Sequence, residues 1–330
     1  MEEVFVLTKK QTLLLLDASS LIFRAFFAVP PLSTKDGKPS NAVLGMAKMM
    51  FAILRTPRDF MAACLDRPEP TFRHVMYKEY KAHRPAIADS LVEQLAPIYE
   101  MLGAFGIHCY EKAGYEADDL IATLCAHAKE KNLETHVITG DMDVLQVVSK
   151  DTTVFMPAKG GPAAFTKYDE AQVMTRFGVS PAQIVDYKSL VGDSSDNIKG
   201  VPGIGPKTAA QLLSQHGTLE ALFKRRDALP EKVSSKLLPH EARAFVNRKL
   251  VTLCDDVAVD INEGELRYQG MNKSALRSFF EKYELHSLVR QIEGNENTES
   301  FPVRMEKESP AQQETKKPEP ENEGGQLQLL

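Results

Sequence analysis

The sequence predicts an α/β fold in which a mostly parallel sheet is flanked by helices, followed by a second, helical part. Three apolar runs, TLLLLD (12–17), FMAACLD (60–66) and THVITGD (135–141), have the continuous hydrophobicity of buried strands. Helical patterns such as NAVLGMAKMMFAILR and DDLIATLCAHAKEK separate these runs. Alternating strands and helices of this kind are typical of a parallel sheet covered on both faces.

From about residue 180 to residue 290 the patterns are mainly helical. In SPAQIVDYKSLVG, Ser180 is a typical N-cap and Pro181 takes the first helical position. GPKTAAQLLSQHG opens on Pro206 and closes on Gly217 in the same way. We therefore expect a larger domain at residues 1–175 and a smaller helical domain at residues 176–292.

Residues 293–330 are predicted to be a disordered tail. Nine acids and four bases from residue 291 onward account for the whole net charge of −5, so residues 1–290 are formally neutral. The tail also carries Pro, Gln and Gly and has few apolar side chains that could be buried in a core.

The N-terminal residues and the cysteines favour a cytoplasmic protein without membrane association. MEEVFVLTKK is acidic and too short in apolar residues for a signal peptide, and no run approaches membrane-spanning length. The four cysteines are scattered without a CxxC pair, which suggests neither a zinc site nor a disulfide framework.

All three predicted strands end on an aspartate: Asp17, Asp66 and Asp141. Ligands of open parallel sheets bind at the carboxyl ends of the strands, so these side chains are expected to converge on one edge. A single aspartate after a strand is commonly only a turn or N-cap residue. Because all three predicted strands end on an aspartate, the pattern favours a shared site.

Six further acids are candidates for the same edge, and they are Glu116, Asp118, Asp119, Asp143, Asp193 and Asp196. Each has a simpler interpretation, since acids cap helix starts and solvate turns. Nine crowded carboxylates would oppose folding unless positive charge lay between them, and these stretches contain no matching cluster of Arg or Lys. The sequence therefore predicts bound Mg²⁺ or Mn²⁺, with two ions roughly 4 Å apart clamping a phosphodiester.

Basic residues elsewhere are expected to bind phosphate. TFRHVMYKEYKAHRP (71–85) interleaves basic residues with tyrosines, which suits a single strand, although a solvated amphipathic helix explains it equally well. GVPGIGPKTA combines Gly203 and Gly205 with a helix start, Lys207 and Thr208. Read as the turn of a helix–hairpin–helix element, it would grip a duplex backbone without reading bases.

Five motifs, in order, resemble the 5′-3′ exonuclease domain of bacterial DNA polymerase I, which belongs to the flap endonuclease family. They are LLLLDASSLIFRAFFAVPPL, TFRHVMYKEYKAHRP, AGYEADDLIATL, ITGDMDVLQV and LVGDSSDNIKGVPGIGPKTA. The resemblance runs from about residue 12 to residue 292. It implies a PIN-like fold with a helical helix–hairpin–helix DNA-binding domain and an arch at about residues 68–92.

The resemblance also implies an activity: hydrolysis of DNA or RNA from 5′ ends and at 5′ flaps or nicks, by a monomer acting in primer removal and DNA repair. The implied metal ligands are Asp17, Asp66, Glu116, Asp118, Asp119, Asp141, Asp143, Asp193 and Asp196. They would hold two or more Mg²⁺ or Mn²⁺ ions, and a monovalent cation such as K⁺ at the hairpin is compatible with the family. The implied catalytic residues are Lys81, Arg24, Asp119 and Asp141, and the arch residues that contact DNA are Arg73, Tyr80, Lys81 and Arg84.

The chain closes on QLQLL, in which Gln326, Leu327, Leu329 and Leu330 resemble the short motif by which bacterial replication proteins dock on the sliding clamp. Apolar side chains at the end of a tether suit that role. Two alternatives remain, because five residues can match by chance and the chain can be part of a longer polymerase.

Two other functions compete with the flap nuclease. A PIN-type ribonuclease shares the fold, although such chains are usually shorter and would not need the helix–hairpin–helix element. A DNA-binding module without catalysis is the second, although such a module would have no use for nine acids facing a polyanion.

Overall fold

The computed structural model describes residues 10–161, 164–226 and 229–294. The predicted clamp motif and almost all of the predicted tail lie outside these ranges.

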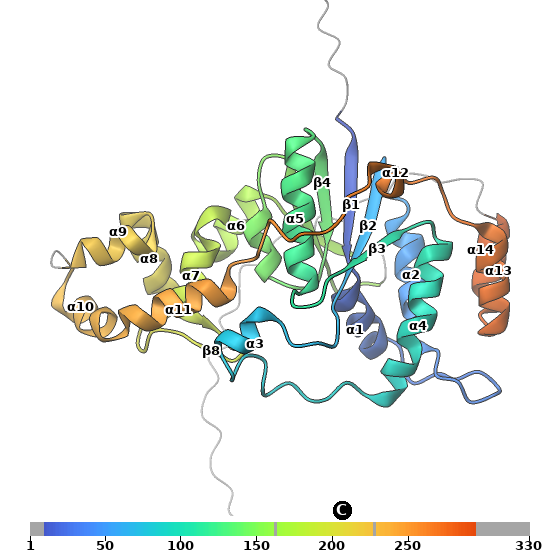
Figure 1. Cartoon of the computed structure of the whole chain (residues 1–330), viewed down its shortest axis with the longest axis horizontal. Helices are drawn as coiled ribbons and strands as arrows, with labels where there is room; N and C mark the ends of the chain where they lie inside the picture. Colours follow the sequence, from blue (N-terminus) through green and yellow to red (C-terminus); the bar gives the residue numbers. More distant parts are fainter. Residues whose placement is uncertain (1–9, 162–163, 227–228, 295–330) are drawn as a thin grey trace, which may run out of the picture.

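A six-stranded sheet forms the centre of the molecule (Figure 1). Its strands are β1 (Thr12–Asp17), β2 (Phe60–Leu65), β3 (His108–Glu111), β4 (Glu134–Ile138), β5 (Thr152–Pro157) and β6 (Phe165–Tyr168). The order is β3-β2-β1-β4-β5-β6, and every pairing is parallel except that of β5 with β6. The predicted mostly parallel sheet is confirmed, and the three predicted strands are its adjacent members β2, β1 and β4.

Helices cover both faces of this sheet, as the apolar strands predicted. They are α1 (Ala18–Ala28), α2 (Asn41–Ile53), α3 (Phe72–Met76), α4 (Asp89–Ala104), α5 (Ala117–Glu130) and α6 (Glu170–Phe177), with the 3₁₀ turn η1 (Asp143–Val147). Side chains of a strand alternate between faces. Leu13 and Leu15 of β1 accordingly pack with α5, while Leu14 and Leu16 pack with α1, α2 and α4.

The helical part follows α6 along the chain. It contains η2 (Pro181–Gln183), α7 (Ile184–Val191), α8 (Pro206–His216), α9 (Leu219–Lys224), α10 (Glu231–Leu237), η4 (Leu238–His240) and α11 (Glu241–Val251), with a small hairpin of β7 (Gly192–Asp193) and β8 (Ile198–Lys199). Helix α8 starts at Pro206 and is followed by Gly217, as predicted. The predicted helix at Ser180 begins as the 3₁₀ turn η2, closed by a capping box between Ser180 and Gln183.

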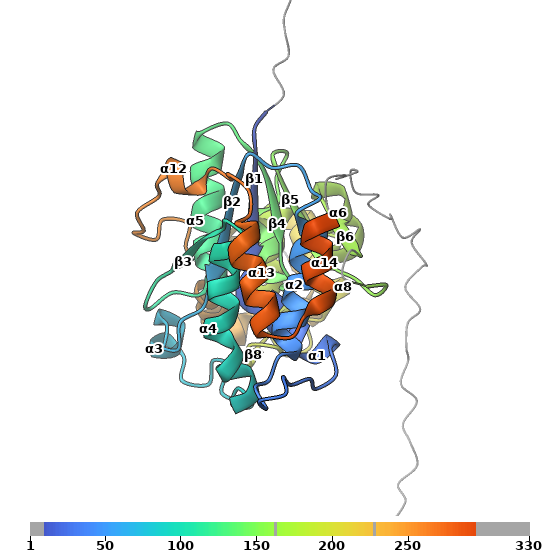
Figure 2. The ribbon, with the colours of Figure 1, turned by 90° about the vertical axis from the view of Figure 1, so that its right-hand side faces the viewer.

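The last three helices return to the α/β body. They are α12 (Glu263–Leu266), α13 (Lys273–Lys282) and α14 (His286–Gly294). Phe280 of α13 packs near the rings of Phe51 and Phe105, and Figure 2 shows α13 and α14 lying over α2 and α4. The helical segment expected at residues 176–292 therefore belongs to two packing units, because its last helices complete the core beside the sheet.

None of the helices in the described ranges combines the length and the apolar character needed to cross a membrane.

Candidate active site

The carboxyl ends of β1, β2 and β4 bring Asp17, Asp66 and Asp141 to one edge of the sheet, because these strands are adjacent and parallel. Asp17 also caps α1: its Oδ1 accepts from the backbone N–H of Ser20 at 2.9 Å, and its Oδ2 accepts from the Thr139 hydroxyl at 2.5 Å. Asp66 Oδ1 accepts from the backbone N–H of Ala117 at 2.8 Å. This last bond ties the edge of the sheet to the start of α5.

Asp118, in the first turn of α5, completes this group. Burial and the charges of Asp141, Asp17 and Asp66 raise the pKa of Asp118 well above its ordinary value. Burial also raises the pKa of Asp17 to about 7. We call Asp17, Asp66, Asp118 and Asp141 the sheet-edge acids. Within the described residues none of the four forms an ion pair, and the Asp118 carboxylate also accepts no hydrogen bond.

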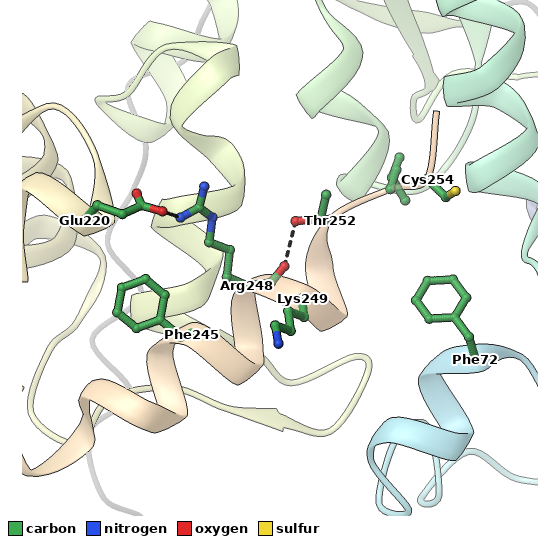
Figure 3. Close-up of a pocket in the computed structure, with 8 residues that line it drawn as sticks. Phe72, Glu220, Phe245, Arg248, Lys249, Thr252 and Cys254 are labelled. Carbon is green, nitrogen blue, oxygen red and sulfur yellow. Dashed lines mark hydrogen bonds and ion pairs between the residues drawn. The ribbon is translucent and has the colours of Figure 1, made fainter. Parts of the chain in front are cut away.

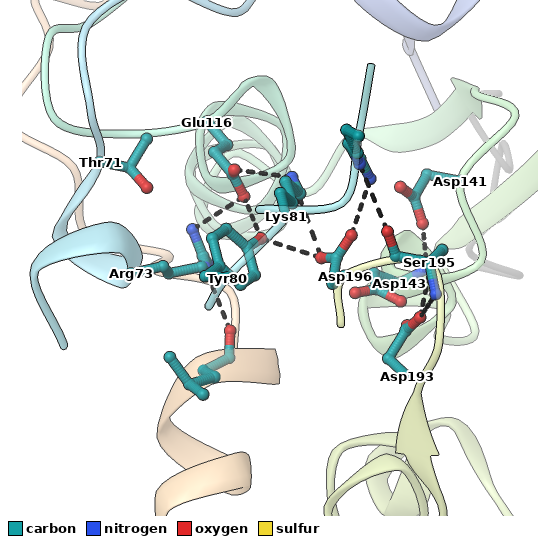
Figure 4. A network of polar contacts seen from close by, with 12 residues as sticks. Thr71, Arg73, Tyr80, Lys81, Glu116, Asp141, Asp143, Asp193, Ser195 and Asp196 are labelled. Atoms are coloured by element: carbon teal, nitrogen blue, oxygen red, sulfur yellow. Dashed lines mark hydrogen bonds and ion pairs between the residues drawn. The ribbon is translucent and has the colours of Figure 1, made fainter. Parts of the chain in front are cut away.

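Four other acids carry basic partners instead (Figure 4). We call Glu116, Asp143, Asp193 and Asp196 the cation-paired acids. Lys81 Nζ lies 2.7 Å from Glu116 Oε1, and Arg84 Nη2 lies 2.7 Å from Asp196 Oδ1. Lys188 Nζ lies 2.7 Å from Asp193 Oδ2 and also contacts Asp143.

The basic partners act to lower the pKa values of Asp193 and Asp196, and burial opposes them at both residues. Burial opposes ionisation of Asp193, but Lys188 and the hydrogen bonds from Ser195 hold its pKa below the ordinary value. Burial dominates at Asp196 and raises its pKa in spite of Lys81 and Arg84. The acidic stretches were expected to lack matching basic residues. The structure supplies them from the arch and from Lys188 of α7, which the sequence analysis missed although it precedes Asp193 by five residues.

The predicted arch contributes Tyr80 and Lys81 to the site. Lys81 adopts a left-handed backbone conformation with φ 53°, and its backbone N–H donates to the carbonyl of Asp196 at 3.0 Å. The Tyr80 hydroxyl lies 2.9 Å from both Glu116 Oε2 and Asp196 Oδ2. Tyr80 is only 3% exposed. Its ring is therefore not accessible for stacking on a base, which differs from the prediction for this stretch. It instead bridges two acids from different parts of the chain.

Arg73 and Asp119 form a buried pair away from the open edge. The guanidinium of Arg73 donates to both carboxylate oxygens of Asp119 at 2.7 Å, and also to the backbone carbonyls of Leu250 and Thr252. The backbone N–H groups of Glu116 and Cys254 donate to the same carboxylate.

This pair differs from the prediction that Arg73 contacts DNA and that Asp119 is a catalytic metal ligand. Arg73 is 2% exposed and Asp119 is 0% exposed. A carboxylate offers about four lone pairs, and four donors occupy those of Asp119. The pair therefore holds α3, the start of α5 and the end of α11 together.

The remaining predicted residues lie outside the acid network. Arg24 is exposed and donates to the carbonyl of Ala158 at 3.0 Å. At the predicted hairpin, Gly203 has φ 77° and Gly205 is the N-cap of α8, with Lys207 exposed and Thr208 half-buried beside it. The K⁺ ion expected at this hairpin stays a prediction.

A pocket of about 360 Å³ opens beside the acids and is lined by Arg84, Gly140, Asp141, Met142, Lys188, Asp193 and Ser195. As placed, no three His, Cys, Asp or Glu side chains in the described ranges could hold one ion together. The chemistry of the sheet-edge acids nevertheless fits a hard divalent cation, since they offer only oxygen donors. Asp118 fits best, because neither of its carboxylate oxygens has a hydrogen-bond or ion-pair partner among the residues that the structure describes.

Comparisons with known proteins agree with this arrangement. Residues 12–178 match the family described as 5′-3′ exonuclease, N-terminal resolvase-like domain, and residues 179–274 match 5′-3′ exonuclease, C-terminal SAM fold. The chain is 34% identical to the 5′-3′ exonuclease of Aquifex aeolicus over 284 residues, which cover 86% of this chain and 96% of that protein. It is 38% identical to DNA polymerase I of Bacillus caldotenax over 296 residues, 89% of this chain, and spans about a third (34%) of that polymerase's length.

Solved structures show the same fold. A zinc-bound T5 5′-exonuclease superposes with a TM-score of 0.58 at 20% identity, covering 83% of this chain and 99% of that one. The catalytic core of Rad2 in complex with DNA substrate gives a TM-score of 0.59 at 16% identity, covering 86% of this chain and 92% of that one.

Proposed function

This chain belongs to the 5′-3′ exonuclease family, and we propose that it is a structure-specific nuclease that uses divalent cations to hydrolyse phosphodiester bonds at 5′ ends and 5′ flaps. The observation that carries the proposal is the set of sheet-edge acids, none of which forms an ion pair among the described residues, although Lys188, Lys81 and Arg84 lie near enough to Asp141 to oppose the rise of its pKa. Cleavage of this kind leaves a 5′-phosphate on the shortened strand, and the role we propose is primer removal and DNA repair.

The sheet-edge acids would hold the cation, Mg²⁺ or Mn²⁺, and the cation-paired acids would complete the site after their basic partners move. A bound divalent cation supplies a water of lowered pKa and offsets charge on the phosphoryl oxygens. Asp66 and Asp17 are fixed for this purpose by their hydrogen bonds to Ala117, Ser20 and Thr139.

Lys81 is the side chain best placed to act on the scissile phosphate. Its ammonium is held between Glu116 at 2.7 Å and Asp196 at 3.9 Å, and these acids raise its pKa although burial opposes them. A protonated lysine at this position stabilises the negative charge that develops on a phosphoryl oxygen. Arg84 faces the same pocket, and Arg24 offers a second phosphate contact from α1.

Other parts of the chain would hold the rest of the substrate. The hairpin around Gly203 and Gly205, with Lys207 and Thr208, would bind the duplex backbone, and DNA with 5′ flaps or nicks and RNA primers are the proposed substrates. In this proposal residues 1–175 form the nuclease domain, with the arch at about 68–92, and residues 176–292 form the DNA-binding domain, except that its last helices, α13 and α14, pack on the nuclease domain and take no part in binding DNA. Docking of Gln326, Leu327, Leu329 and Leu330 on a sliding clamp would tether the enzyme at its substrate.

A labelled 5′-flap duplex incubated with Mg²⁺ or with EDTA tests this function. Cutting at the flap junction in Mg²⁺ alone is the expected result. Binding without cutting would favour a DNA-binding module, and cutting of single-stranded RNA alone would favour a PIN-type ribonuclease.

A further inference from the structure

A second pocket lies apart from the acid network, between α3 and the C-terminal half of α11 (Figure 3). We call it the α11 groove. Its volume is about 500 Å³, within the range of about 300–1,000 Å³ that is typical of ligand pockets. Phe245 and Phe72 lie on opposite sides of the groove in Figure 3, with Lys249 between them.

Two basic residues line the groove, and they differ in their ion pairs within the described ranges. Arg248 is neutralised, because it contacts Glu220 and lies 3.4 Å from Asp186. Lys249 is exposed and has no ion-pair or hydrogen-bond partner in the part of the chain that the structure describes. Two aromatic side chains with an unpaired ammonium between them are the groups that bind unpaired nucleotides, by base stacking and by phosphate contact.

Arg73 separates the groove from the acids of the active site. It is stacked on Phe72, with its Cζ 4.5 Å from the ring centroid, and it donates to the carbonyls of Leu250 and Thr252 at the end of α11. On its other side it donates to Asp119 and Glu116. The groove and the acids are therefore joined through Arg73, and a strand that passes the acids at the foot of the arch can extend toward the groove.

We propose that the α11 groove binds unpaired nucleotides at the 5′ end of the substrate strand, beyond the scissile phosphate. This inference rests on the proposed function, since it takes a flapped substrate as given. It assigns to Lys249 a phosphate contact and to Phe72 and Phe245 the stacking of a base. The groove then adds affinity only for substrates that have a flap long enough to reach it.

Binding of two labelled DNA probes in EDTA, where no cleavage interferes, tests the groove. One probe is a nicked duplex, and the other is the same duplex with a single-stranded 5′ flap of about ten nucleotides, within the range of single-strand site sizes. Lys249→Glu is expected to weaken binding of the flapped probe about tenfold and to leave the unflapped probe within about twofold. It should also reduce the salt dependence of flap binding by about 0.7 per phosphate contact that is lost.

Lys273→Glu is the matched control, because Lys273 is also an exposed helix lysine but lies on α13. It should bind both probes like the wild type. Equal weakening of both probes by Lys249→Glu, or no change in either, would overturn the groove proposal while leaving the nuclease proposal intact. Failure of the wild type to bind either probe would instead count against the proposed function itself.

Discussion

The sheet-edge acids and the cation-paired acids lie side by side but differ in how the fold accommodates their negative charge. Asp118 and Asp17 keep raised pKa values through burial and mutual repulsion. Glu116 and Asp193, by contrast, are held by Lys81 and Lys188 at 2.7 Å. In the part of the chain that the structure describes, the sheet-edge acids have no ion-pair partner, so they are the group that we propose to bind a cation from solution.

Substitutions of Asp118 and of Asp119 are expected to have the largest effects, and they test whether the two neighbours have different roles. Asp118→Asn is expected to reduce cleavage at least about a thousandfold, because it removes a cation ligand, while raising the Tm of the metal-free protein by relieving repulsion. A flap-cleavage assay and a thermal melt in EDTA measure the two effects. Wild-type cleavage by Asp118→Asn would show that the unpaired carboxylate has no role.

Asp119→Asn makes the same chemical change one residue along. It breaks a buried bidentate pair with Arg73, so we expect a loss of about 3–5 kcal/mol in the free energy of unfolding. Denaturant unfolding in EDTA measures it. Equal stability of Asp119→Asn and the wild type would mean that the pair is not structural and that Asp119 is free for a metal after all.

Lys81, the arch residue that pairs with Glu116, tests the role of the basic partners. Lys81→Met should lower kcat about a hundredfold with a small change in KM, since the ammonium stabilises charge that develops in the transition state. Lys78→Met, a change at an exposed lysine three residues earlier, is the control and should stay within about twofold. A raised KM with unchanged kcat would make Lys81 only a binding residue.

Stability of the metal-free protein should fall as the pH rises from about 5 to 8. The pKa of Asp17 is raised from 3.8 to about 7, so the folded state binds more protons than the unfolded state between these values and loses stability as they leave. The expected loss is on the order of 2 kcal/mol. Asp193 does not offset it, because its pKa is lowered from 3.8 and it therefore titrates below this pH range. Asp17→Asn should flatten the pH profile, whereas an unchanged slope in this variant would assign the effect to other groups.

The sheet and the convergence of its three terminal aspartates could be predicted because strand hydrophobicity and strand direction are local signals. The different environments of Asp118 and Asp119 could not be predicted, because adjacent residues at a helix start differ only in which side chains the fold places against them. Arg73 is predicted to contact DNA because its stretch is rich in basic residues, and only its partners Asp119 and the carbonyls at the end of α11 explain why its charge is buried. The basic partners were missed for the same reason, since Lys81 and Arg84 reach the acids across the fold.

Calorimetric titration of Mn²⁺ into the metal-free protein near pH 7, in two buffers of different ionisation enthalpy, tests the central claim most directly. We predict that the wild type binds the cation and releases protons, because the pKa of Asp17 lies near 7 and that of Asp118 is raised well above its ordinary value. Asp118→Asn should bind at least about tenfold more weakly. Equal Mn²⁺ affinity in the wild type and in Asp118→Asn, or no binding by either protein, would contradict the account.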